Sequence, residues 1–423
     1  MSWRRWTIDT GPLRTSRDFR ILLSTQTISS FGANITYVAI PLQVARITHS
    51  PLAVGLLGLC ELGPLLITAL LGGALADYID RRKLVIIGEL SLMTTAVMLL
   101  LNALLAHPML WVLYAVAGLA AALDGLQRPA IEGILPRLVT PDELPAVNAL
   151  RSMTGNTAQL LGPAAAGVMI AAFGFGWAYT FNIVTFLLSL GGLVLIRATP
   201  PPPEAERPSI AGIAAGLRYA RSRPELMGTY AVDIVAMFFG MPMALFPFIA
   251  EKLGGISILG LLYAAPAAGA LLAALTSGWI SHVRRHGLAV IVSAIVWGAA
   301  IIGFGGAHHL WMALAFLALA GAGDEMSGIF RDTIWSQTIP DRLRGRLAGV
   351  EMLSYSIGPT LGNAESGLAA RALGVGGSVV SGGIACVVGV VALAALLPAF
   401  RHYDGPTGIA RKRAEDELVT VPA

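Results

Sequence analysis

Long apolar stretches alternate with short polar connections along nearly the whole chain. In 77–83, five of the seven residues are charged, whereas the preceding 50–76 carries one charge, Glu61. Apolar stretches of about 18 residues or more can cross a bilayer, and in lipid they must be helical because nothing else satisfies their backbone hydrogen bonds. The pattern predicts an all-α membrane protein with twelve transmembrane helices, at 19–44, 51–76, 84–105, 109–131, 147–172, 176–196, 225–250, 255–281, 287–306, 309–331, 345–370 and 374–400.

The composition agrees with a membrane protein and excludes several function classes. Of the 423 residues, 55% are hydrophobic and 13% are charged, whereas soluble domains carry about 25% charged residues. The net charge of +4 comes from basic residues in short clusters between spans, which argues against nucleic acid. No P-loop, metal-ligand spacing or enzyme constellation is present, so we expect no ATP-driven step, cofactor, metal or catalytic activity.

The basic residues also predict the orientation of the chain. If the N-terminus lies inside, 26 of the 29 Lys and Arg residues fall on inside segments, and only Arg46, Lys252 and Arg371 fall outside. Lys and Arg gather on cytoplasmic loops. We therefore expect both termini in the cytoplasm, with 77–83 as a short cytoplasmic loop.

A polar segment divides the chain into two similar halves. We expect a six-helix half at 1–196, a cytoplasmic linker at 197–224, a second six-helix half at 225–400 and a cytoplasmic tail at 401–423. The linker has four consecutive prolines and then a short amphipathic helix that begins near Ser209. The halves repeat each other, because TPDELPAVNAL at 140–150 aligns with IPDRLRGRLAG at 339–349. Two six-helix repeats are typical of one class of secondary transporter.

Several motifs resemble those of the major facilitator superfamily. The stretch from Gly73 is similar to its loop signature G-x-L-x-D-x-x-G-R-R, with Asp80 at the position where glycine is usual. Gly162, Pro163 and Gly167 resemble part of the antiporter signature of helix five. The segments THSPLAVGL (48–56) and PAIEGILPRLVTPDELPAVNAL (129–150) are most similar to the bacterial enterobactin (siderophore) exporter group and its drug-efflux relatives.

This resemblance implies a function that the topology alone does not. It implies proton-coupled antiport of a small amphipathic molecule, a siderophore or a drug-like secondary metabolite, by rocker-switch alternating access. The expected location is the bacterial inner membrane, and the expected form is a monomer whose partners are substrate, protons and lipid. Two alternatives stay open: an uptake symporter or lysophospholipid flippase of the same fold, and a receptor or scaffold without transport, whose buried acids would all be paired.

Acidic residues inside the spans are the strongest functional candidates, because a carboxylate at mid-membrane costs about 2.5–3.5 kcal/mol on insertion scales. By the resemblance, helices one, four, seven and ten line the central cavity. Asp233 is the first candidate for proton coupling, because no basic residue lies within a turn on its own helix. Asp124 could instead pair with Arg128 four residues on, so both a structural and a functional role are open. Glu89 and Glu351 are interpreted as interfacial. The proton-coupling candidates are Glu61, Asp124, Asp233, Asp324 and Glu325.

Two further groups of residues complete the predicted site. In the superfamily the loop aspartate, here Asp77, meets the N-terminus of helix eleven, so we expect a conformational latch there; the alternative is that the charges only orient the chain. The latch residues are Gly73, Leu75, Asp77, Arg81, Arg82, Arg344 and Arg346. The expected substrate cavity includes Gln26, Asn34, Met237 and Met241, for which packing is the competing interpretation.

Overall fold

A computed structural model of the chain describes residues 10–197, 217–340 and 343–420. This part is helical throughout its regular structure and contains no strand. Ten of its helical segments are long and apolar enough to cross a membrane: Pro51–Thr68, Arg81–Ala103, Leu110–Arg137, Pro141–Phe173, Phe175–Leu193, Pro224–Leu253, Ile256–Leu275, His286–Gly305, Leu310–Thr338 and Ser354–Leu396. The prediction of an all-α membrane protein is confirmed.

The helices form two compact units. The described residues of the first unit are 10–49, 60–197 and 255–264, and those of the second are 50–59, 217–254, 265–340 and 343–420. The first unit packs α2 (Arg17–Thr48) against α6 (Leu144–Phe173) and α7 (Phe175–Leu193), and α4 (Arg81–Ala103) against α5 (Leu110–Ile134) and α7. A short α1 (Gly11–Thr15) precedes α2, and the single turns η2 (Leu135–Arg137) and η3 (Pro141–Glu143) join α5 to α6.

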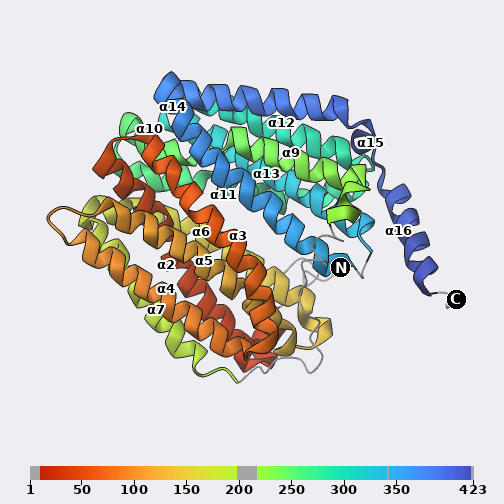
Figure 1. Ribbon diagram of the computed structural model, residues 1–423, viewed down its shortest axis with the longest axis horizontal. Helices are drawn as coiled ribbons and strands as arrows, with labels where there is room; N and C mark the ends of the chain where they lie inside the picture. Colours follow the sequence, from red (N-terminus) through yellow and green to blue (C-terminus); the bar gives the residue numbers. More distant parts are fainter. Residues whose placement is uncertain (1–9, 198–216, 341–342, 421–423) are drawn as a thin grey trace, which may run out of the picture. The chain divides into compact units, whose positions relative to one another are not determined.

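In the second unit, α14 (Arg344–Leu396) packs against α9 (Pro224–Gly240) and α12 (His286–Gly305), which in turn contacts α13 (Leu310–Thr338). Figure 1 shows these helices in green to blue. The second unit also contains η4 (Met243–Leu245), α10 (Phe246–Leu253), η6 (Ser277–His282), α15 (Pro398–Arg401) and the later part of α11 (Leu259–Leu275). The short η5 (Ile256–Ile258) and the first residues of α11 belong to the first unit.

Two helices differ in form from the predicted spans. The span expected as one helix at 225–250 is interrupted: α9 ends at Gly240, and the chain continues through η4 into α10. Pro242 lacks an N–H group and cannot continue the helical ladder, which explains the break. Conversely, α14 covers two expected spans and turns back at Gly374, whose φ of 74° is accessible to glycine.

Polar residues at the helix ends fix where the helices of the first unit begin. The Ser16 hydroxyl accepts a hydrogen bond from the Phe19 N–H at 3.2 Å and caps α2. The Asp80 carboxylate accepts from the N–H groups of Arg82 (2.9 Å) and Lys83 (3.3 Å) and caps α4. Asp80, which departs from the superfamily's usual glycine, therefore starts the helix that follows the charged loop.

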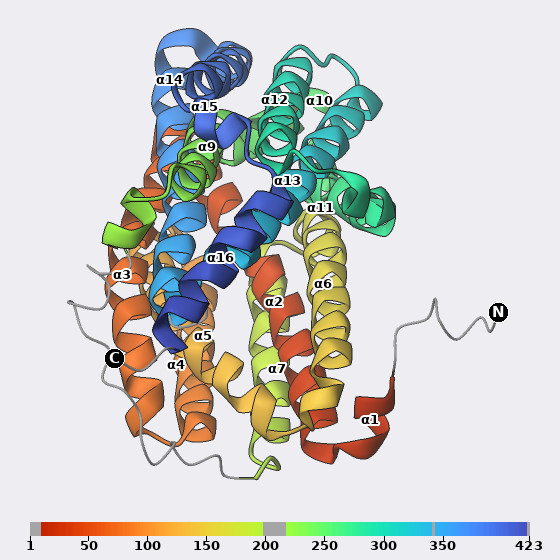
Figure 2. The same cartoon turned by 90° about the vertical axis from the view of Figure 1, so that its right-hand side faces the viewer.

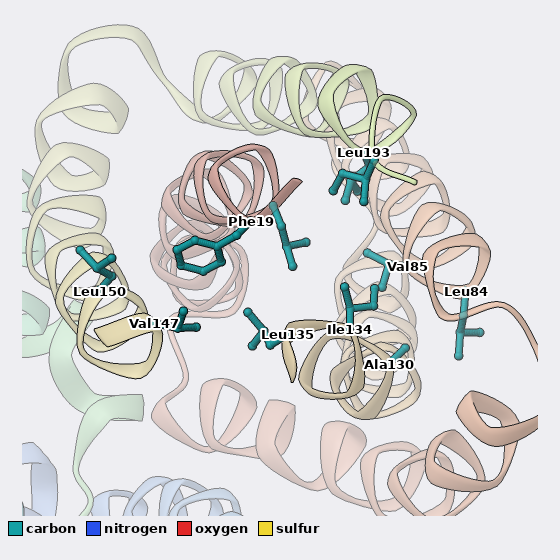
Figure 3. Packing of buried hydrophobic residues seen from close by; sticks show 11 residues of the cluster. Phe19, Leu84, Val85, Ala130, Ile134, Leu135, Val147, Leu150 and Leu193 are labelled. Carbon is teal, nitrogen blue, oxygen red and sulfur yellow. The ribbon is translucent and has the colours of Figure 1, made fainter. Parts of the chain in front are cut away.

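An apolar cluster holds together one end of the first unit (Figure 3). Phe19 of α2 and Leu135 of η2 are buried there beside Val147 and Leu150 of α6. The other buried members of the cluster are Leu22 of α2, Ile196 just after α7, and side chains of α4, α5 and α7, namely Leu84, Val85, Ala130, Ile134 and Leu193. Five helices thus meet where α2, α4 and α6 begin and α5 and α7 end.

The first residues of α3 (Pro51–Tyr78) pack in the second unit, and the first residues of α11 pack in the first. A Cβ atom on Gly58 would collide with the Thr360 carbonyl of α14. Likewise, a Cβ atom on Gly260 would collide with the Pro163 carbonyl of α6. Glycine therefore permits direct backbone contact at both crossings, as is common between membrane helices.

The described part of the predicted tail contains a helix, α16 (Gly405–Thr420), which packs against α13 (Figure 2). The Lys412 ammonium donates to the Ser336 carbonyl at 3.3 Å, and Arg411 lies 3.6 Å from Glu225 of α9. Most of the predicted linker, residues 198–216, lies outside the described residues, including the amphipathic helix expected from Ser209. Residues 217–221 are helical.

We expect Gly58→Ala to lower stability, because overpacking costs about 1–3 kcal/mol where the opposing atom is backbone. Gly63→Ala, five residues later on the same helix, is the control, because a Cβ atom there meets nothing within 4 Å. Thermal unfolding in detergent should give a lower midpoint for Gly58→Ala and an unchanged or higher one for Gly63→Ala. Equal midpoints for the two variants would contradict the close backbone contact between Gly58 and Thr360.

Candidate functional site

Two carboxylates and one guanidinium group form a charged cluster inside the second unit. Arg331 of α13 makes an ion pair with Asp233 of α9, and its Nη2 lies 3.8 Å from Oδ1 of Asp324. Asp324 and Arg331 are two turns apart on one helix and therefore share a face. The Ser354 hydroxyl of α14 donates to the second oxygen of Asp233 at 2.9 Å.

The cluster revises the argument for Asp233. No basic residue lies within a turn of Asp233 on its own helix, but α13 supplies one, so the carboxylate is paired. The side chains of Asp233 and Arg331 are 3% and 9% exposed, whereas that of Asp324 is 42% exposed. Breaking a buried ion pair by removing one partner costs about 3–5 kcal/mol. The cluster thus contains two acids and one base: Asp233 is held tightly by Arg331, and Asp324 is more accessible.

Glu89 of α4, interpreted from the sequence as interfacial, is instead 2% exposed. The Ser29 hydroxyl lies 3.1 and 3.0 Å from its two oxygens, and the amides of Gln26 and Gln127 lie 3.4 Å from Oε1. Neutral donors from α2 and α5 therefore surround this carboxylate. Gln26 and Ser29 are three residues apart on one face of α2, and that spacing was the available signal.

Glu61 of α3 is partly buried in the first unit. It lies close enough to Tyr37 of α2 and Tyr263 of α11 to act on both electrostatically. The two tyrosine rings meet edge to face, with centroids 5.8 Å apart. Within the described part of the chain Glu61 has no hydrogen bond and no ion pair. No cation among the described residues therefore compensates its charge directly.

Asp124 and Arg128 of α5 are both exposed, and they do not approach within ion-pair distance of each other in the described structure. They remain electrostatic neighbours. The close pair nearby is a different one: Arg151 of α6 binds Glu132 of α5 through both guanidinium nitrogens, at 2.9 and 2.7 Å. The fixed Asp124–Arg128 pair considered from the sequence is absent from this geometry.

A pocket of about 280 Å³ opens beside these residues in the first unit. Its wall includes Gln26, one of the predicted cavity residues, and both Arg128 and Arg151. Asn34, the other cavity residue predicted on α2, donates to the Ser30 carbonyl one turn earlier at 2.8 Å. The structure thus brings Gln26, but not Asn34, to this pocket.

In the charged loop, the described arginines bind the carbonyl ends of neighbouring helices. The Arg81 guanidinium donates to Gly133 O at 2.7 Å. Arg82 donates to Leu193 O at 3.1 Å and Val194 O at 2.5 Å. The last carbonyls of a helix lack partners within it and attract cations. Both arginines therefore act as caps on α5 and α7, whatever their effect on orientation.

The other latch residues give a less complete picture. Leu75 packs against the apolar cluster of the first unit. The structure does not describe the surroundings of the remaining latch residues, which are Gly73, Asp77, Arg344 and Arg346. The latch therefore stays a prediction.

The glycines of the helix-five motif are packing positions. A Cβ atom on Gly162 would lie 2.6 Å from the Asn34 Cβ of α2, and one on Gly167 would lie 2.6 Å from the Gly260 nitrogen of α11. With Pro163, whose carbonyl faces Gly260, they form the surface of α6 that α2 and α11 approach closely.

Of the other predicted cavity residues, Met237 lies in the last turn of α9 and Met241 lies at the break just after it. Met237 is 7% exposed, and its Cβ would lie 2.7 Å from a Cβ atom placed on Gly358 of α14. The Asn363 side chain of α14 accepts a hydrogen bond from the Ala244 N–H at 3.0 Å. That bond satisfies a donor which the interrupted helix leaves free. Packing accounts for Met237.

Comparison with known proteins places the chain in a family. The profile of a family described as transmembrane secretion effectors, within the major facilitator superfamily, matches residues 8–421. The chain belongs to this transmembrane secretion effector family. The superfamily resemblance noted in the sequence is thereby confirmed, and the relatives are transporters, not enzymes.

Curated relatives of this family member cover nearly its whole length. It is 27% identical over 410 residues to an enterobactin exporter, EntS, of Shigella boydii serotype 18, covering 96% of this chain and 98% of that one. The enterobactin exporter of Escherichia coli K12 is 27% identical over 407 residues, covering 95% and 97% of the two chains.

Solved transporter structures share the fold. A POT family transporter in complex with 5-aminolevulinic acid gives a TM-score of 0.71 at 12% identity, covering 91% of this chain and 97% of that one. A bacterial homologue of the human lysosomal transporter Spinster gives 0.65 at 16% identity, covering 96% and 99%. At these identities the likeness concerns the fold alone.

We expect Arg82→Gln to lower the thermal midpoint of the family member, because two charge-assisted bonds to the end of α7 would be lost, at about 1.5–3 kcal/mol each. Lys83→Gln is the matched control: it removes the same charge from the same loop, but the Lys83 side chain is exposed. If both variants unfold at the same temperature, the arginine caps contribute nothing measurable and the loop charges serve orientation.

Proposed function

We propose that the chain is a secondary active exporter of the bacterial inner membrane, which exchanges protons for a small amphipathic molecule. The family assignment and the enterobactin exporters that match almost its full length support this proposal. The relatives' names favour a siderophore-like cargo over other secondary metabolites. The protein would work as a monomer with substrate, protons and lipid as its partners.

The proposal includes twelve spans with both termini in the cytoplasm. The two arms of α14 on either side of Gly374 count as two spans, and α2, at 32 residues, is long enough for another. The distribution of Lys and Arg supports the orientation. Two halves, 1–196 and 225–400, would then alternate access to a midplane site, with Asp77 and the start of α14 as the latch.

The observation that carries proton coupling is the shared arginine of the second unit. Protonation of Asp233 would break its ion pair and leave Arg331 with a carboxylate 3.8 Å away. Protonation of Asp324 would leave the close pair intact. We therefore assign the exchangeable proton to Asp324, with Asp233 as the residue that fixes Arg331 in place. Among the remaining candidates, Glu61 is the next choice because it has no ion pair, followed by Glu325 and Asp124.

The proton and the cargo must bias the same conformational equilibrium for transport to be coupled. When Asp324 is charged, Arg331 faces two carboxylates, the buried one of Asp233 and the more exposed one of Asp324. When it is neutral, Arg331 is left with Asp233 alone, and the net charge of the cluster rises by one. A change of one charge in a largely apolar bundle is large enough to favour a different arrangement of helices.

Proteoliposomes with the cytoplasmic face outward test the assignment. With an acidic lumen, the parent should accumulate added enterobactin, and an uncoupler should abolish accumulation. Asp324→Asn should lose accumulation but keep the exchange of labelled for unlabelled enterobactin across the membrane, because only the driving force is removed. Asp332→Asn, which changes an exposed acid on the same helix, is the control and should accumulate normally.

Two further variants separate coupling from stability. Asp233→Asn should lower the thermal midpoint, because it leaves Arg331 buried without its close partner, and Asp233→Asn with Arg331→Gln should recover part of the loss. Accumulation by Asp324→Asn equal to that of the parent would move the proton site elsewhere, with Glu61→Gln the next variant. A parent that moves enterobactin in neither direction would contradict the siderophore-like cargo.

The alternatives make different predictions in the same vesicles. An uptake symporter or lysophospholipid flippase would respond oppositely to the pH step, or not at all. A receptor or scaffold would show no flux. Glu61 is partly buried and has no ion pair with any described residue, which favours the transporter over the scaffold, because a purely structural bundle gains nothing from an uncompensated buried acid.

A further inference from the structure

The pocket of the first unit lies between the first half of α2, the last part of α5 and the start of α6. The pocket lies near one end of the unit, where α2 and α6 begin and α5 ends. In the proposed topology this is the cytoplasmic half of the membrane. A pocket in this half can receive a molecule from the cytoplasm.

The polar wall of this pocket is positively charged. Arg128 and Arg151 line it together with Gln26, Thr27, Ser30 and Thr154, and no carboxylate is among its lining residues. The nearest acids in sequence, Asp124 and Glu132, act on Arg128 electrostatically but do not line the pocket. The wall therefore offers guanidinium, amide and hydroxyl groups, and it offers no repelling anion.

The two arginines are not equivalent. Glu132 holds Arg151 through two bonds, which neutralises it and fixes its position. Arg128 has no hydrogen bond and no ion pair within 4 Å in the described structure. A guanidinium group presents five donors in a planar fork that matches a carboxylate. Arg128 thus provides a positive charge that can bind an anion, and Arg151 provides a polar group beside it that is already held in place by Glu132.

The rest of the lining is apolar and comes from α2, α5 and η2. This apolar part consists of Phe19, Leu22, Leu23, Ile131 and Leu135, of which Phe19, Leu22 and Leu135 belong to the apolar cluster in Figure 3. A volume of about 280 Å³ is near the lower end of small-molecule sites. It suits one aromatic or bicyclic group better than a hydrated inorganic ion.

We propose that this pocket binds an organic anion, with the acidic group on Arg128 and an aromatic or other apolar body against the Phe19 wall. The role of the pocket in transport rests on the proposed exporter function, whereas the binding itself does not. The inference gives the cargo a chemical class: an amphipathic acid, or the acidic part of a larger molecule.

Calorimetric titration of the full chain in lipid nanodiscs, with empty nanodiscs subtracted, tests the inference directly. The probes are 1-naphthoate and 1-naphthamide, which have nearly the same size and differ by one charge. We expect naphthoate to bind the parent about tenfold more tightly, the magnitude of one hydrogen bond to a charged group. Added salt should weaken the binding of naphthoate but not that of naphthamide. Inorganic phosphate should compete poorly with naphthoate, because it leaves the apolar side chains of the pocket uncovered.

Arg128→Gln should abolish the preference for naphthoate, while Arg128→Lys should keep part of it. Lys83→Gln removes an exposed cation away from the pocket and should bind both probes as the parent does. A thermal midpoint for each variant checks folding. If Arg128→Gln fails to fold, the salt dependence and the Arg128→Lys variant still decide the matter.

Equal affinity of the parent for both probes, or a preference that survives in Arg128→Gln, would overturn the inference. Its failure is distinguishable from failure of the exporter proposal. Anion binding without any pH-driven accumulation in vesicles would retain the pocket and reject proton-coupled export. Accumulation of enterobactin that is unchanged in Arg128→Gln, together with equal probe affinities, would retain export and reject the pocket.

Discussion

A charge inside an apolar helical bundle must be paired, hydrogen-bonded or in contact with water, and this constraint organises the candidate sites. Asp233 is paired with Arg331, and Glu89 is surrounded by neutral donors. Asp324 and Glu61 are less completely compensated, since Asp324 shares its arginine and Glu61 has no ion pair with any described residue. The acids with incomplete compensation are those that can change state at least cost, which is why they carry the functional proposals.

Close contact between helices gives these charges fixed positions. Lipid removes most of the hydrophobic driving force between helices, so small residues and interhelical hydrogen bonds hold the bundles together. Gly58 and Gly260 bring backbone against backbone, and Arg81 and Arg82 secure the ends of α5 and α7. The same arrangement positions α2, α5 and α6 around the pocket, so the site depends on packing that lies outside it.

The sequence predicted the helical membrane character well, because apolar length and charge clustering are local properties. Spans such as those near α4 and α12 begin and end within a few residues of the structure. It predicted partners poorly, because the partner of Asp233 comes from α13 and the donors to Glu89 come from α2 and α5. Spacing within one helix cannot reveal contacts between helices. The break after Gly240 was also missed, although Pro242 was its visible cause.

The turn at Gly374 has a consequence for how the protein is made. The two arms of α14 are joined through a single glycine in a left-handed conformation, so almost no polar backbone separates them. Such a hairpin has no long hydrophilic loop between its arms, and Arg371, three residues before the turn, is the nearest charged residue. The two arms can therefore enter the lipid as one paired unit. The two arms would then be inserted in one event, and not one after the other.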